Sequence, residues 1–239
     1  MSLARAPSKT VAPAEMQVPP LENGDHLSAQ EFMRRYEATP EIKKAELIEG
    51  VVYMGSPVRL LHAAPDTIIQ CSLGFYAAHT PGTQAAGNPT VRFSSKNVPQ
   101  PDALVRLLPE YGGRTTVDEK GYLCGPPELI VEIAASSAAI DLHQKLRVYR
   151  RAGVLEYLIW RTVDNQFDWF VLEGDDYRPN PPDVQGQIRS RCFPGLTVAV
   201  GALLAQDSAK VLEALQRELQ KPAHRAFVAR LAARKSRRS

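Results

Sequence analysis

The spacing of apolar residues changes along this chain and predicts where helices and strands lie. Helical spacing is expected over 28–38, and again from near Pro65, with His62 before or within the first turn. Two apolar runs around Glu49-Gly50 predict a β-hairpin that turns there. Two more helices are expected, over 138–152 and beyond 207, and HTPGTQAAGNP is expected to be a turn-rich link. Further strands are expected in VRFSS, PDALVRLL, ELIVEIA, LEYLIW and QFDWFVLEGDDYRP.

The middle of the chain indicates the fold class. ELIVEIA alternates little, which is typical of a strand buried on both faces. A helix ending at Gly153 and the strand LEYLIW follow, and strand–helix–strand spacing favours parallel pairing through a right-handed crossover. The sequence therefore predicts an α/β fold, a mixed β-sheet flanked by helices. We expect a disordered leader over 1–25, one domain over 26–205 and a basic helical tail over 206–239.

Composition excludes several classes of protein. The 239 residues are 44% hydrophobic and 23% charged, and no apolar run is long enough to span a membrane. Three scattered cysteines and no signal-peptide core favour a reducing cytoplasm. The net charge of +3 is uneven, because eight Lys or Arg and one acid lie between Arg217 and Ser239. That tail suits either nucleic-acid phosphates or simple solvation of a frayed terminus.

Two charged residues lie where the pattern predicts a protein interior. Glu132 stands in the middle of the strand ELIVEIA, on the same face as Ile130 and Ala134. Lys145 lies on the apolar stripe of the helix over 138–152, with Leu142 and Tyr149, and Asp141 one turn earlier is placed to pair with it. A buried carboxylate is costly unless a cation is close by. A structural Glu132–Lys145 ion pair and a snorkelling lysine are the simple explanations.

Asp102 changes this picture because it begins another apolar strand, in QPDALV. Together, Asp102, Glu132 and Lys145 give two carboxylates on neighbouring strands and an amine on the adjoining helix. Oxygen ligands of this kind suit Mg²⁺ or Mn²⁺ better than zinc, and no His or Cys cluster has competing ligand spacing.

The ordered motifs AELIEG, QPDALV, PELIVEI and D-xxx-K-xxx-Y-xxx-GVLEYLIW resemble the Uma-type putative restriction endonuclease family of the PD-(D/E)XK nuclease superfamily. The resemblance runs from about Leu27 to about Leu204. It implies a restriction endonuclease-like core, here the nuclease-like domain over 26–205. It also implies a metal-dependent endonuclease that hydrolyses phosphodiester bonds, with DNA as the expected substrate and Mg²⁺ or Mn²⁺ as the cofactor.

The resemblance also implies roles for individual residues. Asp102, Glu132 and the carbonyl of Ile133 are expected to hold the metal. Lys145 is expected to orient or help deprotonate the attacking water, or to neutralise the developing charge, because Ala134 stands where the superfamily's strand lysine would be. The supporting positions are Glu46, His62 and Asp141. Since cleaving both strands of a duplex needs two active sites, a homodimer is expected.

This chain departs from the family pattern at two points. It has Ala134-Ala135-Ser136-Ser137 where Leu-Ser-Pro-Ser/Thr is usual, and Trp160-Arg161 where an acid usually closes the strand. Two other hypotheses therefore stay open. One is an inactive nuclease-fold protein that binds nucleic acid or a protein partner. The other is a structural protein in which Lys145 contacts Glu132 and Asp102 points elsewhere.

Overall fold

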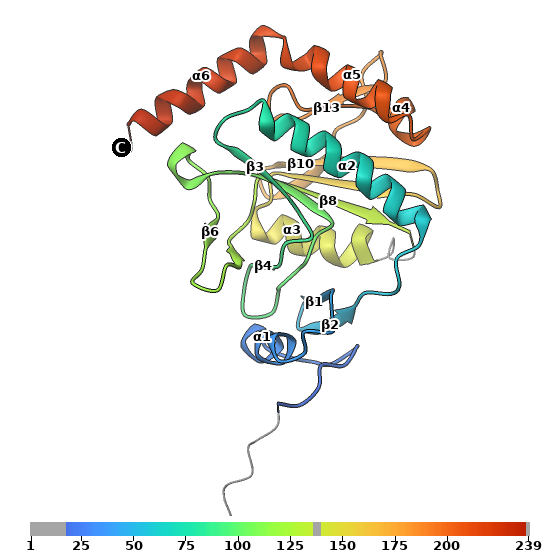
Figure 1. Ribbon diagram of the computed structural model, residues 1–239, viewed down its shortest axis with the longest axis vertical. Helices are drawn as coiled ribbons and strands as arrows, with labels where there is room; N and C mark the ends of the chain where they lie inside the picture. The colour runs from blue at the N-terminus through green and yellow to red at the C-terminus, as the bar shows by residue number, and fades with distance from the viewer. Residues whose placement is uncertain (1–17, 136–139, 238–239) are drawn as a thin grey trace, which may run out of the picture.

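A mixed sheet forms the centre of the molecule (Figure 1), and its six strands have the order β11-β10-β9-β8-β5-β3. The structure is a computed structural model that describes residues 18–135 and 140–237. The strands of the sheet are β3 (Thr83–Gly87), β5 (Ala103–Leu107), β8 (Leu129–Ala134), β9 (Glu156–Arg161), β10 (Gln166–Glu173) and β11 (Asp176–Pro179). This mixed α/β architecture confirms the predicted fold class.

Smaller sheets and the helices surround this centre. The smaller sheets contain β1 (Ala45–Ile48) with β2 (Val51–Met54), β4 (Val91–Arg92) with β6 (Thr116–Val117) and β7 (Leu123–Cys124), and β12 (Gln187–Arg189) with β13 (Thr197–Ala199). The helices are α1 (Ala29–Glu37), α2 (Leu60–Ala78), α3 (Leu146–Ala152), α4 (Val200–Leu204), α5 (Ser208–Leu219) and α6 (Pro222–Ser236), with a 3₁₀ turn η1 (Pro109–Tyr111) and a π-helical turn η2 (Ile140–Lys145).

Each face of the sheet buries its own apolar layer. On one face, α2 packs against β8, and Leu129, Val131 and Ile133 of that strand share an apolar layer with residues of α5 and α6. On the other face, α3 packs against Ile130 and Ala134 of the same strand. Strand β8 is buried along its whole length, as its lack of alternation predicts.

The predicted crossover and hairpin are both present. Strand β8 pairs with β9 in parallel, and η2 and α3 lie between them in sequence. Gly153 ends α3 with a φ of 84°, a left-handed conformation that glycine adopts without strain. Strands β1 and β2 pair antiparallel, and Glu49 and Gly50 both have positive φ, as a two-residue type I′ turn requires.

Two predicted boundaries were wrong. Helix α2 begins at Leu60, five residues before Pro65, with the amides of His62 and Ala63 bonding to the carbonyl of Arg59. The proline is tolerated because the bond that it removes is to the carbonyl of Leu61, at the exposed start of the helix. The expected turn-rich link contains strand β3, which pairs antiparallel with β5 along its full length. Pairing within the sheet outweighs the weak strand propensity of its alanines and glycine.

The two ends of the described chain both pack against the body. Leu21 is buried with α1 and the β1–β2 hairpin. Val211 and Leu215 of α5, with Phe227 and Leu231 of α6, join the apolar layer over α2. Residues 1–17 of the expected leader lie outside the described residues, and the division into three regions stays a prediction. None of the described helices is long and apolar enough to cross a membrane.

Candidate active site

The register of the sheet brings Asp102 and Glu132 together. The antiparallel ladder between β5 and β8 has Ala103 opposite Val131, so its next step brings Asp102 opposite Glu132. Residues directly opposite each other across strands share a face of the sheet. At this point the backbone N–H of Ile133 donates to Oδ2 of Asp102 at 2.7 Å. The Asp102 side chain therefore accepts the hydrogen bond that a backbone carbonyl would accept if the ladder continued by one step.

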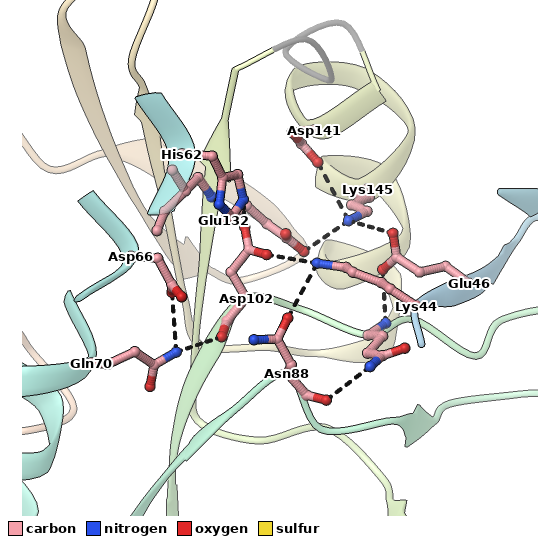
Figure 2. Close-up of polar contacts among 12 residues, drawn as sticks. Lys44, Glu46, His62, Asp66, Gln70, Asn88, Asp102, Glu132, Asp141 and Lys145 are labelled. Carbon is pink, nitrogen blue, oxygen red and sulfur yellow. Dashed lines mark hydrogen bonds and ion pairs between the residues drawn. The ribbon is translucent and has the colours of Figure 1, made fainter. Parts of the chain in front are cut away.

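Asp102 is nearly fully buried and has two basic neighbours. Nζ of Lys44 donates to Oδ1 of Asp102 at 2.6 Å, and Nε2 of His62 lies 3.3 Å from Oδ2 (Figure 2). Burial alone would raise the pKa of Asp102, but the hydrogen bond from His62 and the charge of Lys44 outweigh it and lower that pKa. In turn, Asp102 raises the pKa of His62. Asp102 is therefore held as a carboxylate.

Lys145 lies at the junction between the π-helical turn η2 and helix α3. Its ammonium is buried and faces three carboxylates: Glu46 at 2.8 Å, Glu132 at 3.0 Å and Asp141 at 3.4 Å (Figure 2). A π-helical turn changes the direction of the side chains that follow it and is frequent at functional sites. The lysine at the end of this turn points inward and contacts Glu132.

Glu132 and Glu46 are each fixed by a second partner. Oε1 of Glu132, which contacts Lys145, also accepts a hydrogen bond from the hydroxyl of Tyr149 at 2.6 Å. Oε1 of Glu46 accepts from the backbone N–H of Gln100 at 2.7 Å, so only Oε2 faces the lysine. Among the described residues, Oε2 of Glu132 accepts no hydrogen bond.

The pKa shifts at Lys145 and Glu132 have one physical origin, an excess of acid in a buried space. Burial alone would lower the pKa of Lys145, but Glu132, Glu46 and Asp141 outweigh it and hold that pKa well above its usual value. Burial raises the pKa of Glu132, and the other carboxylates raise it further, while the charge of Lys145 acts in the opposite direction. In this arrangement Lys145 is a protonated hydrogen-bond donor.

The same charge balance fits a divalent cation. Glu46, Asp102, Glu132 and Asp141 face two ammonium groups, those of Lys44 and Lys145, so the carboxylates are in excess. Among the described residues, no group of three or more acidic, histidine or cysteine side chains is arranged to hold a metal alone. Mg²⁺ does not need such a cage, since one or two carboxylates with water and phosphate oxygens suffice. Asp102 and Glu132 are donors of that kind.

All the residues singled out from the sequence lie in this one place. The structure brings together Asp102, Glu132, Ile133, Lys145, Glu46, His62 and Asp141. Sequence reasoning missed Lys44, which directly precedes the AELIEG motif and resembles a surface lysine in KKAEL. One signal in the sequence could have found Lys44. It lies two residues before Glu46, and side chains two positions apart on a strand point to the same face.

The hypothesis of a structural Glu132–Lys145 ion pair makes two predictions, and the structure agrees with only one of them. Lys145 contacts Glu132 directly, as that explanation requires. Asp102, however, does not point elsewhere, because it bonds to the backbone of Ile133 beside Glu132. A third and a fourth carboxylate also surround the pair, which a structural ion pair does not require.

Comparisons with known proteins identify the family and the fold of the chain. The model of the Uma2 family, described as "Putative restriction endonuclease", matches residues 29–201. A crystal structure of a putative nuclease belonging to DUF820, from Anabaena variabilis ATCC 29413, is similar with a TM-score of 0.60. The similarity covers 75% of this chain and 98% of that one at 13% identity, so it shows the shared fold. None of the curated proteins matches the chain.

Proposed function

Because the chain belongs to the Uma2 putative restriction endonuclease family, we propose that it is a divalent-metal-dependent endonuclease that hydrolyses phosphodiester bonds of DNA. The cofactor is Mg²⁺ or Mn²⁺. The observation that carries the proposal is the buried ammonium of Lys145 among Glu132, Glu46 and Asp141, next to the Asp102–Ile133 contact. A buried cluster with this excess of acid is costly for folding alone and suits the binding of a cation.

Asp102 and Glu132, with the carbonyl of Ile133, would hold the metal. When bound, Mg²⁺ supplies a Lewis acid that polarises a phosphoryl oxygen and makes a bound water more acidic. Lys145 donates hydrogen bonds, and its positive charge stabilises negative charge that develops on the phosphoryl oxygens. Water adds to phosphorus, the bond to the ester oxygen breaks, and that oxygen leaves with a proton.

The neighbouring residues act on the orientation of these groups. Glu46 holds the lysine from the side of the β1–β2 hairpin, and Tyr149 fixes one oxygen of Glu132. His62 holds Asp102 from the first turn of α2. Cleavage of both strands of a duplex needs two such sites, which supports a homodimer as the active form.

A catalytically inactive nuclease-fold protein that binds nucleic acid or a partner protein is the second candidate. The observation that favours it is that Lys44 and Lys145 each engage a carboxylate assigned to the metal. Such a protein binds DNA with a steep dependence on salt but cleaves none.

Nicking of supercoiled plasmid tests the first proposal. We expect nicking in Mg²⁺ or Mn²⁺, none in EDTA, and none from Glu132→Ala or Lys145→Ala. The matched controls are Glu213→Ala and Lys210→Ala, two exposed residues of α5 that should nick like the wild type. Cleavage that persists in both site variants would overturn the assignment. DNA binding without cleavage in either metal favours the second candidate.

A further inference from the structure

An exposed and mainly apolar segment lies beside the candidate active site. All residues from Gly55 to Leu61, in the sequence GSPVRLL, are exposed. Val58 is 70% exposed, Leu60 79% and Leu61 46%, so three large apolar side chains face solvent within four positions. Elsewhere in the described chain, exposed large apolar residues occur singly, as is ordinary for a protein surface.

Both ends of the segment are fixed to residues of the site. At its start, the backbone N–H of Gly55 donates to the carbonyl of Lys44, whose ammonium contacts Asp102. At its end, His62 follows Leu61 directly and contacts the other oxygen of Asp102. In Figure 2, Lys44 and His62 approach Asp102 from different elements. The segment therefore spans two contacts of one catalytic carboxylate.

The segment itself carries positive charge and no negative charge. No acidic residue occurs between Gly50 and Pro65, and the first turn of α2 also has none. Arg59 lies within the segment, and Lys44, whose carbonyl accepts from Gly55 and whose ammonium contacts Asp102, lies at its start. Apolar side chains flanked by cations match the two surfaces of DNA, which are the bases and the phosphate backbone.

A second copy of this chain fits the segment less well. A stable protein interface buries about 20–30 residues on each side, and this exposed run has only seven. A two-fold interface centred on it would also bring the cations of both copies together. DNA is the better match for a short apolar ridge with a cationic border.

We propose that residues 55–61 form a DNA-contacting ridge that presses Val58, Leu60 and Leu61 against the bases beside the scissile phosphate. The inference rests on the proposed nuclease function and adds a contact that none of the catalytic residues makes. Apolar side chains inserted between base steps unstack them and bend the duplex. The ridge thus supplies apolar contact area, while Arg59 supplies a phosphate contact.

Fluorescence anisotropy with a labelled mixed-sequence duplex, in EDTA and over a range of salt, tests the ridge. Leu60→Ser and Leu61→Ser should each weaken binding about tenfold, since each loses the burial of one leucine side chain. The slope of log K against log salt should not change, because an apolar contact releases no counterions. Arg59→Ala should instead reduce that slope by about 0.9. Val184→Ser, at an exposed valine between β11 and β12, should bind like the wild type.

The result that overturns the ridge differs from the one that overturns the function. If the wild type nicks plasmid but the two serine variants bind with unchanged affinity, the ridge fails and the nuclease stands. If the wild type neither binds nor nicks DNA, both fail. If Leu60→Asp converts a dimer into a monomer in sedimentation and leaves DNA affinity unchanged, a second copy covers the segment and the ridge fails. Unchanged thermal unfolding midpoints confirm that these exposed substitutions leave the fold intact.

Discussion

Nζ of Lys44 lies 2.6 Å from Oδ1 of Asp102, while the backbone N–H of Ile133 donates to Oδ2. Both oxygens of this carboxylate are therefore engaged. A metal ion that binds Asp102 must compete with the ammonium of Lys44 for one of them. We therefore expect Lys44 to lower the affinity of the proposed metal site for cations.

Lys44→Met should bind Mn²⁺ more tightly than the wild type, by about tenfold, because removing one positive charge next to the ligand removes its repulsion of the metal. Isothermal titration calorimetry measures this directly and does not depend on cleavage. Lys43→Met changes the same charge at the neighbouring exposed position and should leave the affinity nearly unchanged. Equal or weaker Mn²⁺ binding by Lys44→Met would show that the two cations do not compete.

Lys145→Met should lower the free energy of unfolding by about 3–5 kcal/mol, because it leaves buried carboxylates without their cation. Adding Glu132→Gln should restore part of this loss, since it removes one of the charges that Lys145 balanced. Urea denaturation of the two single variants and the double variant measures the coupling. Additive losses would mean that the lysine and the glutamate act independently.

His224 should make stability depend on pH. The ring is buried between the hydroxyl of Thr80 and the carbonyl of Leu219, and burial lowers its pKa even though that carbonyl favours the protonated ring. The unfolded chain, with a histidine pKa of about 6.5, then takes up a proton more readily than the folded one. The stability that the neutral ring provides is complete above that pH and is lost as the pH falls through the folded pKa.

Urea titrations between about pH 5 and 8 test this sign, since that interval spans the titration of histidine. His224→Gln should show a shallower fall in unfolding free energy at low pH than the wild type. The exposed His143→Gln should retain the wild-type slope. A slope in His224→Gln equal to that of the wild type contradicts the prediction.

Glu156→Ala should destabilise the fold by about 3–5 kcal/mol without removing a residue of the proposed chemistry. The buried Glu156 accepts hydrogen bonds from Trp169 Nε1, Ser190 Oγ and the backbone N–H groups of Arg191 and Cys192. Each of these donors loses its acceptor in the variant. Thermal or urea unfolding measures the loss, and nicking per folded molecule should stay at the wild-type rate.

Glu110→Ala is the matched control for Glu156→Ala, because Glu110 is an exposed acid at the η1 turn. Its stability should lie within about 0.5 kcal/mol of the wild type, as for most surface substitutions. A similar loss in both variants would mean that the hydrogen bonds of Glu156 contribute nothing particular.

The sequence predicted those elements whose pattern reflects burial in the sheet. ELIVEIA and LEYLIW are apolar because both faces of β8 and β9 are covered, so their parallel pairing could be inferred. The positions of Glu132 and Lys145 were informative for the same reason, since charged residues are rare in such surroundings. Strand β3 depends on its pairing with β5, a partner distant in sequence, and no local pattern reports that partner.

The contacts of Lys44 could not be predicted for a related reason. A lysine before a strand is usually solvated, and only the register of β1 against the rest of the molecule turns this one toward Asp102. The π-helical turn η2 was equally hidden, because its residues fit the pattern of an ordinary helix. Both features arise from packing between elements.

The position of Lys145 on a helix rather than on the strand of Glu132 has a consequence for folding. The sheet alone can bring Asp102 and Glu132 together, because they lie opposite each other across β5 and β8. The lysine arrives only when α3 docks through Val148 and Tyr149 onto the face that carries Ile130. A molten state with an intact sheet and an undocked helix would keep its acidic ligands and lack their amine. Catalytic competence would then be the last property that the chain acquires as it folds, and the first that it loses on heating.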